Sequence, residues 1–280
     1  MPSRTALLTA AARALHREEP QPWVFDDWFA LQLGGDDAVR MGETLRERLP
    51  AASLLAFTRW VCVRSRLPED VVERAAAAGI RQYVILGAGL DSFAYRRDDL
   101  LERVRVFEVD HPASQQWKRR RLQELGVHPP ANLVYAPVDF ERQELRAGLT
   151  AAGFDFSAQA VWSWIGVTMY LTLDAIRATL ATISECSPGT RLVLTYNQPQ
   201  AALAGRSLAI ETTMRAIVSD LGEPMISLFT PAQVEQLLRE LGYDELTHFG
   251  PEEARHTYFA DRDDVRFGGA QRIVMASVAA

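Results

Sequence analysis

A pair of glycines between two apolar runs is the part of this chain with the clearest chemical meaning. Residues 83–86 are apolar and lead into Gly87-Ala88-Gly89, and a second run over residues 104–109 is followed by Asp110. A strand, a glycine turn, a helix and a second strand with a carboxylate at its tip together bind a nucleoside in open α/β sheets. The glycine backbone can approach a ligand closely, and the carboxylate can accept hydrogen bonds from both ribose hydroxyls. Gly87, Ala88, Gly89 and Asp110 are therefore predicted to contact a nucleoside-type cofactor.

The residues after the glycine pair favour S-adenosylmethionine over a dinucleotide. Ser92 stands where the dinucleotide pattern needs a third glycine, and Asp91 would repel a diphosphate at the start of the following helix. S-adenosylmethionine has a ribose and an adenine, no phosphate and a positive sulfonium. An NAD-dependent dehydrogenase is the alternative that this reasoning disfavours.

Four segments resemble the leucine carboxyl methyltransferase family, especially its bacterial branch of S-adenosylmethionine-dependent methyltransferases. They are residues 85–96 (ILGAGLDSFAYR), 107–112 (FEVDHP), 137–140 (PVDF) and 169–172 (MYLT), in the family's order and spacing. The resemblance runs from about Phe25 to the C-terminus. It implies an S-adenosylmethionine-dependent methyltransferase but does not identify the substrate. Together with a long apolar roof over the site and no basic surface, it leads us to expect an O-methyltransferase that acts on a carboxylate or hydroxyl of a small molecule, as in specialised, polyketide-type metabolism. Methylation of a protein C-terminal carboxylate and a cofactor-binding protein without catalysis stay open as alternatives.

The resemblance also assigns roles outside the glycine turn. It implies that Arg64 pairs with the cofactor's carboxylate, to which a guanidinium can donate two parallel hydrogen bonds. It implies that Tyr170 lies near the acceptor and orients a substrate oxygen, which makes Tyr170 the candidate catalytic residue. Many family members have a glutamate where this chain has Ile165, so a contact to the cofactor's amino group is missing here or is supplied elsewhere.

Four further residues are candidate cofactor contacts. Asp139 follows the third expected strand and can accept a hydrogen bond from the adenine amino group, and Phe140 beside it offers the base an apolar face. The resemblance supports both, although Asp139 could instead cap a helix. His111 is expected to pack against the adenine. Trp164 is expected near the sulfonium, where cation–π attraction would contribute about 0.5–2 kcal/mol.

The acceptor site is expected between the sheet and a helical roof. Tyr196 and Asn197 end the fifth expected strand, and both are predicted to face the crevice as substrate contacts. The segment after them, residues 197–228, is too long for one plain crossover and is expected to fold over the strand ends. Glu211, Arg215 and His256 are candidates for polar substrate contacts, but each is expected at the surface.

The expected partner is a small-molecule acceptor, and composition gives no support for nucleic acid, metal or membrane. The net charge of -6 gives no electrostatic support for a nucleic-acid partner, and the basic run Lys118 to Arg121 is expected to be a solvated helix face. Cys62 and Cys186 have no Cys or His at metal-ligand spacing, so no metal site is expected. No apolar stretch reaches membrane length, which favours a cytoplasmic protein without membrane contact. The sequence leaves the oligomeric state open, with a homodimer as one option.

The alternation of strand and helix patterns predicts an α/β fold with a doubly wound sheet. The expected strands cover residues 83–86, 104–109, 133–137, 160–164, 191–196, 244–249 and 272–278. The resemblance implies a Rossmann-like class I methyltransferase with a seven-stranded, mostly parallel sheet and an antiparallel last strand. We expect a single domain over residues 1–280.

Within this domain, residues 1–75 are expected to form a helical lid interrupted at Pro68 and residues 76–196 the cofactor-binding core. Residues 197–230 are expected to form a cap, and residues 231–280 the rest of the core. The last two strands are expected to form a hairpin without a helix between them. Thr230, Pro231 and Gln233 predict a capped helix start.

Overall fold

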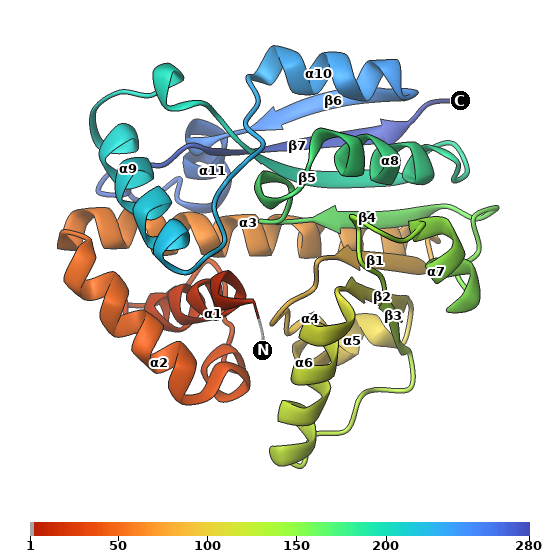
Figure 1. Cartoon of the computed structure of the whole chain (residues 1–280), viewed down its shortest axis with the longest axis horizontal. Coiled ribbons are helices and arrows are strands. Elements are labelled where there is room, and N and C mark those ends of the chain that lie inside the picture. The colour runs from red at the N-terminus through yellow and green to blue at the C-terminus, as the bar shows by residue number, and fades with distance from the viewer. Residues whose placement is uncertain (1–2) are drawn as a thin grey trace.

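The computed structural model describes residues 3–280, and seven strands in it form one sheet (Figure 1). Their order is β3-β2-β1-β4-β5-β7-β6. Strands β1 to β5 pair in parallel, and β7 runs antiparallel to both of its neighbours. The strands are β1 Gln82–Leu86, β2 Arg105–Asp110, β3 Leu133–Pro137, β4 Ala160–Trp164, β5 Arg191–Asn197, β6 Tyr243–Phe249 and β7 Gln271–Val278. The predicted fold class is confirmed, and every expected strand lies within one residue of its observed bounds.

Helices occupy most of the remaining described chain. They are α1 Arg4–His16, α2 Ala30–Arg48, α3 Ala51–Ala77, α4 Phe93–Arg96, α5 Asp98–Leu101, α6 Pro112–Glu124, α7 Leu145–Ala151, α8 Leu173–Ser184, α9 Gly205–Asp220, α10 Pro231–Glu240 and α11 Pro251–Tyr258, with short 3₁₀ turns η1 Thr168–Tyr170 and η2 Gln200–Ala202. Helix α10 begins with the predicted capping box of Thr230 and Gln233. Within residues 3–280, no helix is both long and apolar enough to cross a bilayer.

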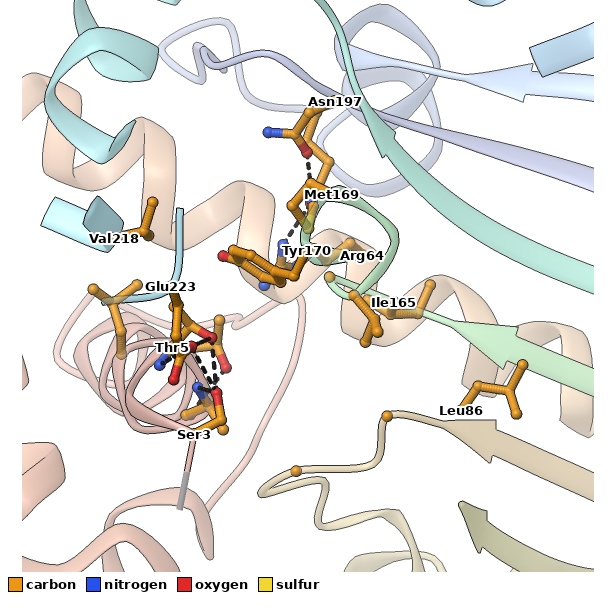
Figure 2. A pocket seen from close by; sticks show the side chains of 18 of the residues that line it. Ser3, Thr5, Arg64, Leu86, Ile165, Met169, Tyr170, Asn197, Val218 and Glu223 are labelled. Atoms are coloured by element: carbon orange, nitrogen blue, oxygen red, sulfur yellow. Dashed lines mark hydrogen bonds between the residues drawn. The ribbon is translucent and has the colours of Figure 1, made fainter. Parts of the chain in front are cut away.

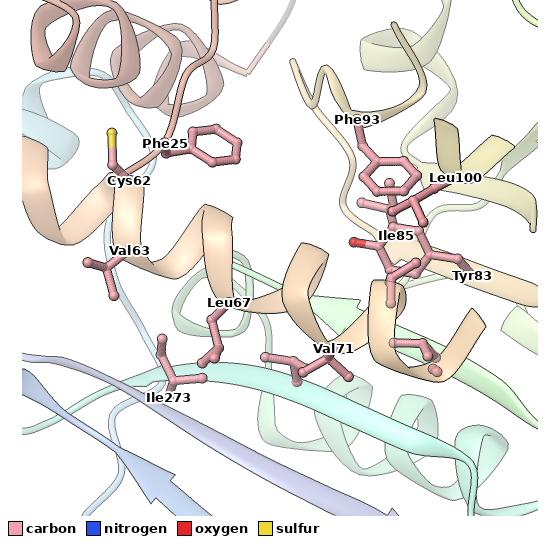
Figure 3. Close-up of a cluster of buried hydrophobic side chains, with 14 of the residues drawn as sticks. Phe25, Cys62, Val63, Leu67, Val71, Tyr83, Ile85, Phe93, Leu100 and Ile273 are labelled. Atoms are coloured by element: carbon pink, nitrogen blue, oxygen red, sulfur yellow. The ribbon is translucent and has the colours of Figure 1, made fainter. Parts of the chain in front are cut away.

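Each face of the sheet is covered by its own apolar core. On one face, α3 lies across the strands and buries residues such as Val63, Leu67 and Val71 against Ile85 and Ile273 (Figure 3). On the other face, α7, α8 and α10 pack against the alternate strand residues, among them Trp162 and Trp164. Because successive strand side chains point to opposite faces, the apolar runs of the sequence supply both cores at once.

The N-terminal helices and α9 form a separate group at the carboxyl ends of the strands (Figure 1). Leu8 of α1 and Val61 of α3 pack with Ile210 and Met214 of α9. Helices α1 and α2 also share a buried cluster with Leu122 of α6. This group therefore covers the strand ends from which a ligand would be bound.

Two expectations about local structure were wrong. Helix α3 continues through Pro68, because Leu67, Val71 and Val72 are buried on the sheet and this packing outweighs the hydrogen bond that proline removes. Helix α11 lies between β6 and β7, although a hairpin without a helix was expected. Its N-terminal signal is Gly250-Pro251 followed by acids, and the Glu253 carboxylate accepts from the Gly250 amide at 2.8 Å.

The expectation that Lys118 lies on a solvated face was also wrong. Its side chain is buried, and its Nζ lies 2.7 Å from Oε2 of the equally buried Glu108. Nζ also donates to the Asp91 carbonyl at 2.6 Å. The ammonium group therefore joins α6 to β2 and to the turn after β1. The arginines that follow it are partly or fully exposed, as expected.

Candidate active site

A cavity of about 640 Å³ opens where the parallel strands end. It lies beside the point at which the strand order reverses between β1 and β4, the usual ligand position in an open α/β sheet. Its volume is typical of small-molecule sites. All the predicted site residues line it except Trp164 and Tyr196: Arg64, Gly87, Ala88, Gly89, Asp110, His111, Asp139, Phe140, Tyr170 and Asn197.

The glycine turn is shaped by its backbone. Gly87 and Gly89 have φ values of 65° and 49°, in the left-handed region that favours glycine. A Cβ atom at Gly87 would also overlap the Val167 side chain, so this glycine lets the loops after β1 and β4 approach each other. The amides of Gly87 and Ala88 both donate to the Val109 carbonyl, which fixes the turn against β2.

Asp110 is held in place by the same turn. Its Oδ2 accepts from the Gly89 amide at 2.6 Å, and its Oδ1 accepts from the His111 amide at 2.7 Å. Burial raises the pKa of Asp110, while these two amides act in the opposite direction. Each carboxylate oxygen retains a second lone pair, so the group can still accept from two ribose hydroxyls.

The residues predicted to surround adenine come together next to Asp110. The Nε2 of His111 lies 3.7 Å from Oδ2 of Asp139. His111 also begins α6, where its Nδ1 accepts from the Ala113 amide at 3.1 Å. Asp139 accepts from the Glu141 amide at 3.0 Å, so it caps a turn and lines the cavity at once. The alternative that Asp139 caps a helix is wrong, because the next helix, α7, has Glu144 at its N-cap position.

Arg64 offers a prepared anion site. Its side chain is buried, and Nη1 donates to Oε1 of Gln271 at 2.5 Å. Among residues 3–280, its Nε has no hydrogen-bond partner. Burial lowers the pKa of Arg64 to about 10, which still leaves it charged near neutral pH. An unsatisfied buried donor is costly, and the carboxylate of S-adenosylmethionine would satisfy it. The residues present therefore fit this cofactor.

The other end of the cavity is apolar with a few polar groups. Figure 2 shows Tyr170 reaching from its loop toward the segment that carries Val218 and Glu223, with Asn197 on the opposite side. Met169, Met214 and other apolar side chains complete the wall. Burial raises the pKa of Tyr170 to about 12 despite the nearby positive charge of Arg64, so its hydroxyl is protonated and can donate a hydrogen bond.

Glu223 closes the cavity over α1, a role that the sequence analysis missed. Its carboxylate accepts from the amides of Arg4 and Thr5 at 2.8 and 3.2 Å, and from the hydroxyls of Ser3 and Thr5 at 2.9 and 2.5 Å (Figure 2). Free amides and a positive dipole end make the first turn of a helix a good carboxylate site. Glu223 and the first turn of α1 are more than 200 residues apart, and no local sequence pattern connects them. The one signal in the sequence was the turn Gly222-Glu223-Pro224, which marks a sharp change of chain direction.

Two predicted contacts do not reach the cavity. Tyr196 and Asn197 are successive strand residues, so they face opposite sides of the sheet. Asn197 lines the cavity, whereas the Tyr196 hydroxyl lies 3.0 Å from Nδ1 of His248 in the other core. The same alternation turns Trp164 away while Ser163 and Ile165 face the cavity. Trp164 lies beside Phe140 of the cavity wall, with ring centroids 6.2 Å apart.

Glu211 differs from its expected surface position. Its side chain is 3% exposed and lines the cavity, whereas Arg215 is partly exposed and His256 is exposed. The sequence held a usable signal, because Glu211 shares a helix face with Met214 and Val218 at three-and-four spacing. Gln271 also lines the cavity and was not anticipated.

Comparison with known proteins gives a consistent result. The family model for leucine carboxyl methyltransferase matches residues 6–184. A Bacillus subtilis protein named as a proposed S-adenosyl-L-methionine-dependent methyltransferase is 31% identical over 284 residues, which cover 94% of this chain and 93% of the relative. A Mycobacterium tuberculosis protein with the same kind of name is 40% identical over 191 residues, covering 68% of this chain and 62% of that protein.

Solved structures share the fold at low sequence identity. A Thermobifida fusca structure described as a proposed methyltransferase superposes with a TM-score of 0.63 at 18% identity, covering 90% of this chain and 93% of that chain. A Streptomyces avermitilis protein of the DUF574 family gives a TM-score of 0.61 at 18% identity, covering 96% of both chains.

Proposed function

This chain belongs to the leucine carboxyl methyltransferase family and is an S-adenosylmethionine-dependent methyltransferase, and we propose that it methylates an oxygen atom of a small molecule. The observation that carries this proposal is the cavity itself. Cofactor residues such as Gly87 and Asp110 share it with an apolar chamber that α1, α9 and the Glu223 segment cover. A chamber roofed by the enzyme's own chain suits a small acceptor better than a protein terminus.

Each group in the cavity has a defined task in this function. Asp110 and the glycine turn would hold the ribose, Asp139 and Phe140 the adenine, and Arg64 the carboxylate of the methionine part. When bound, S-adenosylmethionine supplies an electrophilic methyl group on a positively charged sulfur. The protein aligns the acceptor oxygen with that methyl group and excludes water, and such alignment can supply about 7–11 kcal/mol of the barrier reduction. Tyr170 would orient the acceptor through its protonated hydroxyl.

The proposal is tested by following a labelled methyl group. The purified protein is incubated with methyl-labelled S-adenosylmethionine and either a protein-free metabolite extract or the protein fraction of the same cells. We expect label in the metabolite fraction. Mild alkali then separates acceptors, because it releases label from carboxyl esters and leaves ethers intact.

Asp110→Ala is the inactive control. Asp36→Asn, at an exposed acid outside the cavity, controls for the loss of one negative charge. Asp110→Ala should abolish both cofactor binding and labelling, whereas Asp36→Asn should change neither. Label confined to the protein fraction would contradict a small-molecule acceptor. Cofactor binding without labelling of either fraction would favour a protein that binds the cofactor but has lost catalysis.

A further inference from the structure

The roof helix α9 places a buried carboxylate at the acceptor end of the cavity. Glu211 is 3% exposed, and its Oε1 has no hydrogen-bond partner among residues 3–280. The cation nearest to it on α9 is Arg215, whose Nη1 lies 3.9 Å from Oε1 and also has no hydrogen-bond partner in the described chain. Leaving a buried acceptor without a hydrogen bond is unfavourable, and more so for a charged group. Glu211 therefore lines the cavity with a buried carboxylate, one oxygen of which makes no hydrogen bond within the described chain.

A chain of side-chain amides separates this carboxylate from the cation of the cavity. Arg64 donates to Gln271 at 2.5 Å, and Gln271 donates through Nε2 to Oδ1 of Asn197 at 3.2 Å. Burial raises the pKa of Glu211, while the charge of Arg215, the Ala270 backbone amide and the Asn197 side-chain amide act in the opposite direction. Two side-chain amides, those of Gln271 and Asn197, thus lie between Arg64 and Glu211.

The remaining charges near the acceptor end are unsuited to an anion. Arg13 lines the cavity, but its Nε is bound to Oδ2 of Asp27 at 2.7 Å. Glu223 adds a second carboxylate, which is turned toward the amides of α1. If Arg64 holds the methionine carboxylate, an acceptor carboxylate would meet like charge in a largely apolar chamber, and like charges at short range are strongly unfavourable there.

We propose that Glu211 accepts a hydrogen bond from the hydroxyl group that is methylated, so that the acceptor is an alcohol or a phenol and not a carboxylic acid. This inference rests on the proposed function and specifies its substrate class. The acceptor oxygen forms a bond to the methyl carbon, the carbon–sulfur bond breaks with both electrons going to sulfur, and the hydroxyl proton passes to Glu211. The proton then leaves to solvent when the products depart. A general base of this kind typically contributes 10²–10⁴-fold to a rate.

The test measures binding before turnover. S-adenosylhomocysteine is titrated calorimetrically into the protein, and the complex is then titrated with 4-propylphenol or with 4-propylbenzoate, which share their apolar part. We expect the phenol to bind about tenfold more tightly or better, as a hydrogen bond to a charged group implies. In Glu211→Gln, the phenol should bind more weakly and the benzoate more tightly, so that the preference collapses. Asp220→Asn, the same change at an exposed site on α9, should leave the preference intact.

The outcomes distinguish a failure of the hydroxyl assignment from a failure of the proposed function. Failure of S-adenosylhomocysteine to bind the folded protein would remove the proposed function. Tight binding of S-adenosylhomocysteine together with equal or stronger binding of the benzoate would overturn only the hydroxyl assignment. Binding of neither probe to the wild-type complex would overturn it as well, and so would a phenol preference that survives in Glu211→Gln.

Discussion

Among single residues, Arg64 shows how burial can prepare a side chain for one ligand group. The guanidinium is out of solvent, one nitrogen is engaged by Gln271 and another has no partner among the described residues. We expect Arg64→Met to weaken S-adenosylhomocysteine binding about 10- to 100-fold, because a charge-assisted hydrogen bond to a carboxylate is lost. Methylthioadenosine has no carboxylate, so its affinity should change little. Calorimetric titration of both ligands checks the assignment.

The neighbouring Arg66 supplies the control for this comparison. It is about two-fifths exposed and pairs with Asp70 on the next turn of α3. Arg66→Met should alter the affinity of neither ligand. If Arg64→Met weakens both ligands equally, Arg64 shapes the cavity and does not recognise the carboxylate.

Most of the predicted residues that line the cavity lie at strand ends within local motifs. Gly87, Gly89 and Asp110 share one strand–turn–strand unit, so their spacing fixes their positions. Tyr196 and Trp164 were misplaced because a strand end was identified without deciding which face each side chain would take. Glu211 and Glu223 lie on the cap, and their burial depends on how α9 docks on helices from the other end of the chain. The apolar face of α9 indicates which side of the helix is buried, but no local pattern says which helices cover it.

At the scale of elements, one buried ion pair connects β2 to α6. Lys118 and Glu108 are each about 1% exposed, with 2.7 Å between Nζ and Oε2. Removing one partner leaves an uncompensated buried charge, so Lys118→Met should lower the free energy of unfolding by about 3–5 kcal/mol. The double variant Lys118→Met/Glu108→Gln should recover much of that loss. Urea unfolding followed by circular dichroism gives the free energy of unfolding of the wild type, the two single variants and the double variant. If the losses of the two single variants simply add in the double variant, the pairing is contradicted.

The contact between the cap and α1 is a second link between elements. Glu223 accepts from the amides of Arg4 and Thr5, which lie in the first turn of α1. Glu223→Gln removes the charge and should cost about 0.5–2 kcal/mol, the range for a helix cap. Hydrogen exchange of the α1 amides should accelerate accordingly, while exchange in the β4 amides stays unchanged. Glu102→Gln, at an exposed acid outside the cavity, is the control; equal exchange in both variants would show that the contact does not hold the cap.

The strands were predicted more accurately than the helix boundaries. All seven strands could be placed from the sequence. In β1, β4 and most of β2 and β5, burial on both faces leaves a continuous apolar signal, whereas the edge strand β6 is buried only at its two end residues. The error at Pro68 arose because a local penalty was weighed without the packing of α3 on the sheet. The error at α11 arose because its eight residues are mostly polar and bury only Ala254, so they give no apolar periodicity, although Pro251 and the acids after it marked a helix start.

At the scale of the whole molecule, the cavity is where the separate parts of the chain meet. Its wall takes residues from α1, α3, the ends of β1, β2 and β4, and α9. A ligand that binds there contacts groups that are brought together only in the folded state. Binding should therefore stabilise the entire fold, by about 2.7 kcal/mol when the ligand is present at 100 times its Kd.

Acylation of Lys118, the single lysine of the chain, can measure how much ligand binding stabilises the fold. Lys118 is buried and bonded to Glu108 and to the Asp91 carbonyl, so an acylating reagent reaches its amine only after unfolding. If that unfolding is global, S-adenosylhomocysteine at 100 times its Kd should slow acylation about 100-fold, which is the same 2.7 kcal/mol expressed as a rate. Mass spectrometry of the peptide that contains Lys118 follows the reaction independently of the N-terminal amine. In Asp110→Ala the ligand should no longer protect. If Lys118 of the wild-type protein is acylated quickly and at the same rate with and without S-adenosylhomocysteine, α6 opens locally. The pair with Glu108 would then not depend on the fold around the cavity.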